Sequence, residues 1–279
     1  MNRPFRAFAP PRLAPLCLAT GLFAAGLFAA NAATAGVVTV NLSPAADATV
    51  FEENADTSDS KSPGLFAGRT NTDHARRAFV RFDFAGIPAN VTVSSVEVRL
   101  SLTRANSGSV FASLFRVTAG WGEGTSDASI PGGSGAPATP GDPTWTMRVY
   151  PGTPWAVPGG DTAALPSATT LLGSSLVDYF WTTTPGLVGD VQGWIGAPAT
   201  NFGWQLRADE AQIAPTAKRF GSREQSDASL RPVLTVTYDD PAVGAPPPVT
   251  ANVVPALGAR ALIGLASALA ILGVLALKR

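Results

Sequence analysis

The sequence is poor in the residues that build disulfides, zinc sites and most nucleophilic active sites. Its 279 residues include one cysteine, Cys17, and one histidine, His74. A single cysteine cannot form an internal disulfide, and the pair cannot supply the three or four ligands of a usual zinc site. No G-x-S-x-G nucleophile turn occurs, so His74 is expected to be a solvated loop residue rather than a catalytic base. We therefore predict a protein that is not an enzyme.

An excess of positive charge is also missing. Lysine and arginine together number 20, as do aspartate and glutamate. Residues 1–35 and 254–279 hold three basic side chains each, so the region between them has 14 basic and 20 acidic residues. This mild negative excess argues against a nucleic acid as the partner, because nucleic-acid-binding proteins normally present a basic face.

The first 35 residues have the pattern of a secretory signal peptide. They begin with three arginines and no acid, continue with an apolar run at 18–28, and end on small residues around Ala30 and Ala32. Cys17 lies inside this leader, so the mature protein is expected to be exported without cysteine and stabilised by its core. After residues 36–238, the Pro-rich stretch 239–253 predicts a stiff linker.

Residues 254–279 form a short apolar tail. Residues 261–277 are apolar and are followed by Lys278 and Arg279, which predicts a transmembrane helix of about the minimum length with its basic end in the cytoplasm. Together with Val254-Pro255-Ala256-Leu257, the tail resembles the C-terminal sorting signals of the PEP-CTERM and IPTL-CTERM kind. The resemblance implies envelope sorting machinery and the inner membrane as partners, and leaves cleavage of the tail open.

The region 36–238 shows the period of two that is typical of strands. Apolar and polar residues alternate at 78–84, 96–103, 202–207 and 234–238. Strands of this kind have one buried and one wet face, and Phe79 and Arg81 fall on the face expected to be wet. Only 187–195 looks helical, with Leu187, Val191 and Trp194 on one face. We predict an all-β antiparallel sandwich with jelly-roll closure and one short helix.

A set of short motifs occurs in a defined order between residues 40 and 238. They include Ala46-Asp47-Ala48-Thr49-Val50, Arg77-Ala78-Phe79-Val80-Arg81-Phe82-Asp83-Phe84, Trp121-Gly122-Glu123-Gly124-Thr125, Gly159-Gly160-Asp161, Phe202-Gly203-Trp204-Gln205-Leu206-Arg207 and Gly221-Ser222-Arg223-Glu224. Their order resembles the DNRLRE domain family, also described as disaggregatase-related, although the hexapeptide that names the family is absent. The resemblance implies an extracellular β-sandwich module, with carbohydrate binding in some members.

Four arginines on the predicted wet faces suggest a ligand surface. If their strands are neighbours, Arg77, Arg81, Arg99 and Arg207 form one stripe, and guanidinium groups pair well with uronate or sulfate groups. An acidic polysaccharide is therefore the predicted partner. The alternative is a solvated sheet face whose arginines are neutralised by other residues of the same strands.

Two tryptophans are candidates for stacking on sugar rings. Trp145 and Trp155 lie among prolines and glycines, where exposed rings could contact a ligand, although packing within the loop would explain them equally. Trp194 and Trp204, in contrast, fall on positions expected to be buried.

An acidic segment near the start of the domain could bind calcium, which prefers oxygen ligands. Asp47, Glu53 and Asp56 are the predicted ligands of a structural calcium ion, and a solvated acidic loop is the alternative. In sum, the sequence predicts a non-catalytic protein of the cell envelope or extracellular matrix that binds or structures polysaccharide. A purely structural surface protein and an uncharted polysaccharide-active enzyme remain as alternatives.

Overall fold

The computed structural model describes residues 36–106, 108–129, 133–212 and 215–243. The predicted leader, the tail with its span at 261–277, and residues 244–253 of the predicted linker lie outside these ranges. Among the described residues, no helix is both long and apolar enough to cross a membrane.

The described chain is built mainly of strands. The first half contains β1 (Gly36–Leu42), β2 (Pro44–Phe51), β3 (Thr57–Asp59), β4 (Gly64–Arg69), β5 (Ala75–Phe82), β6 (Thr92–Ala105), β7 (Val110–Arg116), β8 (Ala136–Pro137), β9 (Met147–Val149) and β10 (Thr153–Pro154). The second half contains β11 (Ala168–Leu172), β12 (Asp178–Trp181), α1 (Pro185–Gly196), the 3-10 turns η1 (Pro198–Thr200) and η2 (Ala228–Leu230), β13 (Trp204–Ala208), β14 (Lys218–Gly221) and β15 (Val233–Asp240).

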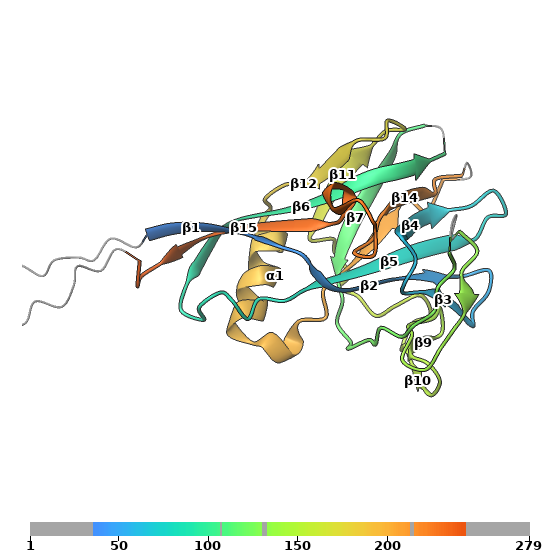
Figure 1. Cartoon of the computed structure of the whole chain (residues 1–279), viewed down its shortest axis with the longest axis horizontal. Helices are drawn as coiled ribbons and strands as arrows, with labels where there is room; N and C mark the ends of the chain where they lie inside the picture. Colours follow the sequence, from blue (N-terminus) through green and yellow to red (C-terminus); the bar gives the residue numbers. More distant parts are fainter. Residues whose placement is uncertain (1–35, 107, 130–132, 213–214, 244–279) are drawn as a thin grey trace, which may run out of the picture. The chain divides into compact units, whose positions relative to one another are not determined.

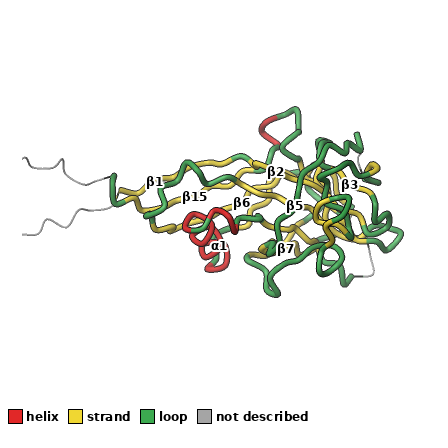
Figure 2. The backbone as a smooth tube through the Cα atoms, turned by 90° about the horizontal axis from the view of Figure 1, so that it is seen from below, coloured by secondary structure: helices red, strands yellow, loops and turns green. Residues whose placement is uncertain are grey.

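Thirteen of these strands belong to one antiparallel sheet. Its main path runs β1-β15-β6-β14-β4-β5-β13-β7-β11, and β12, β2, β3 and β8 pair alongside it. β9 and β10 form a separate hairpin. Figures 1 and 2 show β1 and β15 running side by side, with α1 against the neighbouring β6. The long connections between sheet neighbours, such as β6 with β14, mean that distant parts of the sequence meet on one surface.

The main hydrophobic core lies between two parts of this sheet. Alternate residues of β6 and β15 (Val96, Val98, Leu234, Val236) belong to the same buried cluster as alternate residues of β5, β13 and β7 (Val80, Phe82, Leu206, Leu114). Each such side chain contributes about 1.5–3 kcal/mol when it is fully removed from water. The arrangement is that of a sandwich, which confirms the antiparallel β fold expected from the period of two, while jelly-roll closure stays a prediction.

The predicted helix is confirmed. Thr184 caps α1, since its hydroxyl accepts a hydrogen bond from the Leu187 backbone N–H at 3.1 Å, and Pro185 starts the first turn without a donor to satisfy. Leu187, Val191 and Trp194 are buried on one face, as their spacing requires. The helix therefore closes one side of the core.

Phe79, on the outer face of β5, is buried, contrary to the expectation that it is exposed to solvent. A second buried cluster forms there from Ala48, Val50, Phe79, Trp121 and Trp155, beneath the long segment between β7 and β11. The segment approaches closely because Gly160 has φ = +115° and a Cβ atom at that position would lie 2.8 Å from the Phe79 ring. Alternation along β5 could not reveal this cover, because the covering residues come from far along the chain.

Candidate functional site

The structure brings together only two of the four predicted arginines. Arg77 on β5 and Arg207 on β13 line one cavity of about 560 Å³. Arg81 lies apart, with its guanidinium 5.4 Å from the centre of the Trp121 ring. Arg99 lies on β6, which β14 and β4 separate from β5. The prediction of a single arginine stripe is therefore wrong, because its strands are not all neighbours.

Arg99 has a structural environment. Its guanidinium donates to the Asp178 carboxylate at 3.0 Å and to the backbone carbonyls of Ser229 at 2.8 Å and Arg231 at 3.0 Å. Burial acts to raise the pKa of Asp178, but the hydrogen bonds that its carboxylate accepts from Ser101 and Arg99, together with the positive charge of Arg99, lower it overall. Arg99 thus ties β6, β12 and η2 together and leaves few donors for a ligand.

The two candidate tryptophans differ in exposure. Trp155 is 5% exposed, stacks on Phe79 at a centroid distance of 5.3 Å, and donates its indole N–H to the Thr144 carbonyl at 3.0 Å. The ring is therefore buried, contrary to the expectation that it could be exposed to a ligand. Trp145 is half-buried, and the Arg77 guanidinium lies 4.7 Å from its ring centre. Trp194 and Trp204 are buried, as predicted.

The arginine beside Arg207 is already ion-paired. Arg77 donates Nε and Nη2 to the two oxygens of Glu210 at 2.8 and 2.7 Å. Arg207 donates to the hydroxyl of Thr162 at 2.9 Å, and its guanidinium lies 4.6 Å from the centre of the Phe115 ring. Burial and the nearby Arg77 lower the pKa of Arg207 to about 10, so it stays charged at neutral pH. We call the outer surface of β13, β7 and β11 around this residue the Arg207 face.

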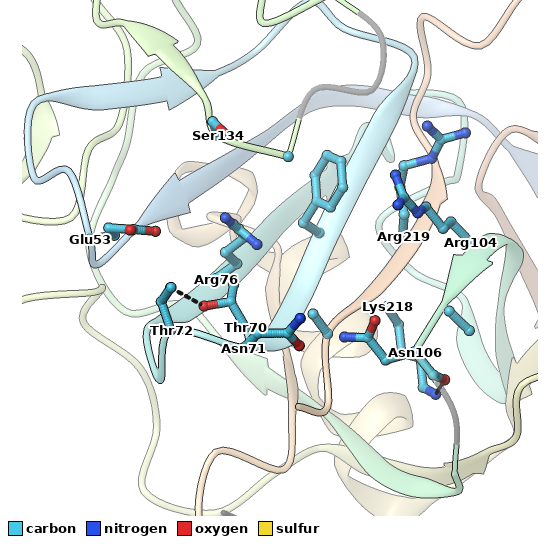
Figure 3. A pocket seen from close by; sticks show the side chains of 14 residues that line it. Glu53, Thr70, Asn71, Thr72, Arg76, Arg104, Asn106, Ser134, Lys218 and Arg219 are labelled. Carbon is cyan, nitrogen blue, oxygen red and sulfur yellow. Dashed lines mark hydrogen bonds between the residues drawn. The ribbon is translucent and has the colours of Figure 1, made fainter. Parts of the chain in front are cut away.

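A second cavity, which the sequence did not suggest, holds three arginines. It has a volume of about 410 Å³, and Arg76, Arg104 and Arg219 line it together with Glu53 and Phe66. Figure 3 shows Arg104 and Arg219 together on one side and Arg76 and Glu53 on the other. We call this cavity the arginine pocket.

The strand register explains why the three arginines converge. Arg104 on β6 pairs with Arg219 on β14, and Arg219 pairs with Phe66 on β4. β4 then pairs with β5 through Gly68 and Arg76. The pocket thus crosses four adjacent strands, at the ends of β5 and β6 and beside the turn that follows β4. The sequence alone could not reveal that these strands are neighbours.

The guanidinium groups of the arginine pocket form no ion pair with the acidic residues that the structure describes. Among the described residues, no carboxylate forms an ion pair with Arg76, Arg104 or Arg219. Burial lowers the pKa of Arg76, which Glu53 partly offsets, and burial and Arg104 lower the pKa of Arg219. Because the guanidinium group is strongly basic in water, Arg76 and Arg219 remain charged at neutral pH despite this lowering of the pKa. The pocket therefore carries a net positive charge in a partly desolvated setting.

Uncharged polar groups complete the lining. The hydroxyls of Thr70 and Thr72 share a hydrogen bond of 2.9 Å, drawn in Figure 3, and Asn71, Asn106 and Ser134 also face the cavity. Lys218 adds little, because it is 1% exposed and its Nζ donates to the carbonyls of Asn106 and Gly108 at 2.9 and 3.0 Å. The pocket can therefore pair with an anionic group and hydrogen-bond to adjacent hydroxyls.

The predicted calcium ligands do not form one group. Glu53 lines the arginine pocket, and Asp56 lies in the exposed turn before β3. Asp47 instead lies near Glu123 and Glu224, with one carboxylate oxygen from each within 4.8 Å of the others. The three residues are therefore not grouped as predicted, since Asp47 is buried on β2 whereas Glu53 and Asp56 are exposed in the turn that follows it.

Basic residues already balance much of this acidic group. Arg223 donates Nε and Nη2 to Glu123 at 3.1 and 2.6 Å, and Lys61 lies 3.3 Å from Glu123 and 3.7 Å from Glu224. Asp47 is 1% exposed and accepts the Arg223 backbone N–H at 2.8 Å. Burial and the negative charge of Glu224 raise its pKa, so the group is chemically closer to a buried ion network than to a calcium loop. Structural calcium stays a prediction.

The pH dependence of stability should reveal a second buried acid. Burial raises the pKa of Asp59 to about 6, even though Ser62 donates two hydrogen bonds to its carboxylate. An unfolded aspartate has a pKa of about 3.9, so folding takes up a proton between these values. The stabilisation is complete below pH ~4 and is lost as the pH rises through ~6, by up to about 3 kcal/mol.

The measurement is urea unfolding of the wild type and Asp59→Asn across this pH window. The variant should lose most of the fall in unfolding free energy, and the part due to Asp47, whose pKa is raised in the same direction, should remain. If the unfolding free energies of the two proteins changed equally with pH, the assignment of this pH dependence to Asp59 would be contradicted.

Comparison with known proteins points to one class of ligand. Residues 38–127 match the sequence model of carbohydrate-binding module family 96. No curated protein matches the chain. The matched segment includes most of β1 and all of β2 to β7, and so supplies Glu53, Arg76 and Arg104 of the arginine pocket, whereas Arg219 lies beyond it. Over residues 38–127, the chain is thus similar to a family of carbohydrate-binding modules.

Proposed function

We propose that the protein is a non-catalytic polysaccharide-binding module whose ligand carries acidic groups, and that these groups enter the arginine pocket. One observation carries the proposal: three guanidinium groups converge on a cavity of about 410 Å³ without an ion-paired carboxylate among the described residues. The similarity to carbohydrate-binding module family 96 supports a sugar polymer as the ligand class.

The chemistry of the lining favours carboxylate or sulfate groups on a sugar. The planar guanidinium fork donates two parallel hydrogen bonds to such groups, and these charge-assisted bonds are about twice as strong as neutral ones. Thr70, Asn71 and Ser134 supply partners for neighbouring hydroxyls. The cavity volume also falls within the range of about 300–1,000 Å³ that is usual for small-molecule sites.

The Arg207 face is less suited to an acidic ligand. Glu210 already engages Arg77 through two hydrogen bonds, and Asp161 lines the same cavity as Arg77 and Arg207. An anion bound there would have to compete with fixed carboxylates. In the arginine pocket, Glu53 is the one acidic side chain of the lining, against the three arginines and the internally bonded Lys218.

The predicted ends of the chain suggest where such a module would work. A leader at residues 1–35 and a sorting signal at 254–279 of the PEP-CTERM or IPTL-CTERM kind would deliver a DNRLRE-type domain to the cell envelope or matrix. The tail would hold it at the inner membrane, at least for a time. A structural protein without glycan affinity and a polysaccharide-active enzyme are the competing functions.

Matched pairs of polymers test the proposal. We expect tight binding of polygalacturonate and much weaker binding of its methyl ester, because esterification removes the charge and keeps the backbone. Dextran sulfate and dextran form a second pair that separates sulfate from carboxylate. Affinity should fall as added salt shortens the Debye length from about 10 Å at 0.1 M to about 3 Å at 1 M.

Calorimetric titration provides the affinities, and chromatography of the polymers after incubation reports any cleavage. Equal affinity within each charged and uncharged pair would refute the proposal. Absence of binding to every polymer would favour the structural alternative, and newly released oligosaccharides would favour an enzyme.

A further inference from the structure

A row of polar side chains crosses the Arg207 face. Arg207 on β13 pairs in register with Ser113 on β7, and Ser113 pairs with Thr169 on β11. The hydroxyls of Ser113 and Thr169 share an exposed hydrogen bond of 2.8 Å. On the other side, Leu206 pairs with Ala78 of β5, which places Arg77 beside Arg207. Hydrogen-bonding groups are therefore aligned over four neighbouring strands.

Two hollows meet along this row. One of about 560 Å³ lies toward Arg77 and the segment 156–164, and the other, of about 240 Å³, lies toward Phe111. Both are lined by Arg207 and Phe115. Phe111 is 59% exposed and pairs in register with the exposed Leu171. The face thus offers an apolar surface, including an open aromatic ring, next to hydroxyl and guanidinium donors.

The Arg207 face has no excess of positive charge. Glu210 accepts two hydrogen bonds from Arg77, and Asp161 accepts the backbone N–H groups of Ala156 and Val157 at 3.0 and 2.8 Å. Across the two hollows, three carboxylates (Asp161, Asp209 and Glu210) face the two arginines, so no positive charge is left in excess. An anionic ligand would lose its hydration here without gaining a net counter-charge, which favours an uncharged one.

We propose that the Arg207 face is a second carbohydrate-binding site, which takes uncharged sugar residues. The apolar faces of pyranose rings stack on Phe111 and Phe115, and sugar hydroxyls accept hydrogen bonds from Arg207. Ser113 and Thr169 exchange further hydrogen bonds with these hydroxyls. The inference extends the proposed function and rests on it for the class of ligand.

The two sites lie on different sides of β5. Arg76 lines the arginine pocket, and the next residue, Arg77, lines the hollow beside Arg207. Successive side chains of a strand point to opposite faces, so occupation of one site leaves the other open. One molecule can then hold an acidic segment and an uncharged segment at once, and so join two polysaccharide chains.

The test measures binding to uncharged polymers, with methyl-esterified polygalacturonate and hydroxyethyl cellulose as probes. Phe111→Ala combined with Arg207→Gln should weaken this binding by about tenfold or more, given the usual worth of a hydrogen bond to a charged group. Ser113→Ala with Thr169→Ala, a change confined to exposed hydroxyls, should weaken it by about threefold to tenfold. Arg104→Gln serves as the matched variant of the other site and should chiefly affect polygalacturonate.

Light scattering of wild-type protein mixed with both polymer types should show cross-linked particles, which each site variant reduces. The inference is overturned if neither uncharged polymer binds, or if the variants of the Arg207 face lower uncharged and acidic binding equally. If Arg104→Gln leaves polygalacturonate binding intact while the Arg207-face variants abolish uncharged binding, the proposed role of the arginine pocket fails and the second site stands.

Discussion

Replacing Arg104 and Arg219 together by glutamine is expected to lower the affinity for an acidic polysaccharide by about 100-fold or more. A hydrogen bond to a charged group contributes about 1.5–3 kcal/mol, and each tenfold change in affinity corresponds to about 1.4 kcal/mol. The two residues are cross-strand partners and line the same side of the arginine pocket. Their joint removal leaves Arg76 facing Glu53, so the pocket loses most of its excess positive charge.

The fold should survive this double substitution. Arg104 is exposed, and within the described chain the Arg219 guanidinium donates one hydrogen bond, to the Thr103 hydroxyl at 2.9 Å. Glutamine keeps most of the aliphatic stem, and surface substitutions usually change stability by less than about 0.5 kcal/mol. An unchanged unfolding midpoint would therefore separate a binding defect from a folding defect.

Arg116→Gln is the matched control for charge. Arg116 has a 44% exposed side chain and pairs with Asp190 at 3.1 Å, away from the residues that line the pocket. The Arg116→Gln substitution removes one positive charge, as each substitution in the arginine pocket does. The pocket assignment is contradicted if Arg116→Gln weakens polygalacturonate binding as much as Arg104→Gln alone, because the effect would then follow net charge rather than position.

Substitution of Trp204 by alanine is expected to lower the unfolding free energy by about 3–5 kcal/mol, which is the usual cost of emptying a buried aromatic site. Trp204 is 0% exposed and meets Trp194 edge-on at a centroid distance of 4.6 Å. Its indole N–H donates to Asp190 at 2.8 Å, so the substitution also removes a donor from a carboxylate whose pKa burial raises. The loss of packing and the loss of this hydrogen bond both lower the unfolding free energy.

Denaturant unfolding followed by circular dichroism measures the effect, with Phe111→Ala as the control. Phe111 sits on an adjacent part of the sheet but is largely exposed, so its removal should cost about 0.5 kcal/mol or less. A cost below about 1.5 kcal/mol for Trp204→Ala would mean that the site collapses around the cavity or that Trp204 is not a central core residue.

Local sequence patterns were sufficient to predict four of the strands, the helix and much of the hydrophobic core. The alternation at 78–84, 96–103, 202–207 and 234–238 corresponds to β5, β6, β13 and β15, and the spacing of Leu187, Val191 and Trp194 corresponds to α1. The burial of Trp194 and Trp204 followed from the same patterns. These properties depend on residues two to four positions apart, which a sequence displays directly.

The candidate binding surfaces depend on contacts between residues that are far apart in the sequence, which local sequence patterns cannot predict. Arg77 and Arg207 were identified as candidates, but the pairing of Arg77 with Glu210 and the separation of Arg99 from both emerge only from the folded structure. The prediction that Phe79 lies on a solvent-exposed face was also wrong, because residues far along the chain cover it.

The amino-acid sequence is sufficient to predict an antiparallel β protein with one short helix, a largely apolar core and a single cysteine, Cys17. The folded sheet is needed to show that Arg104 and Arg219 are neighbours and that Arg76 faces the same cavity. The physical reason is that side-chain alternation reports which face a residue occupies, whereas a binding site requires the identity and register of the adjacent strands. Those are set by the folding of the whole sheet.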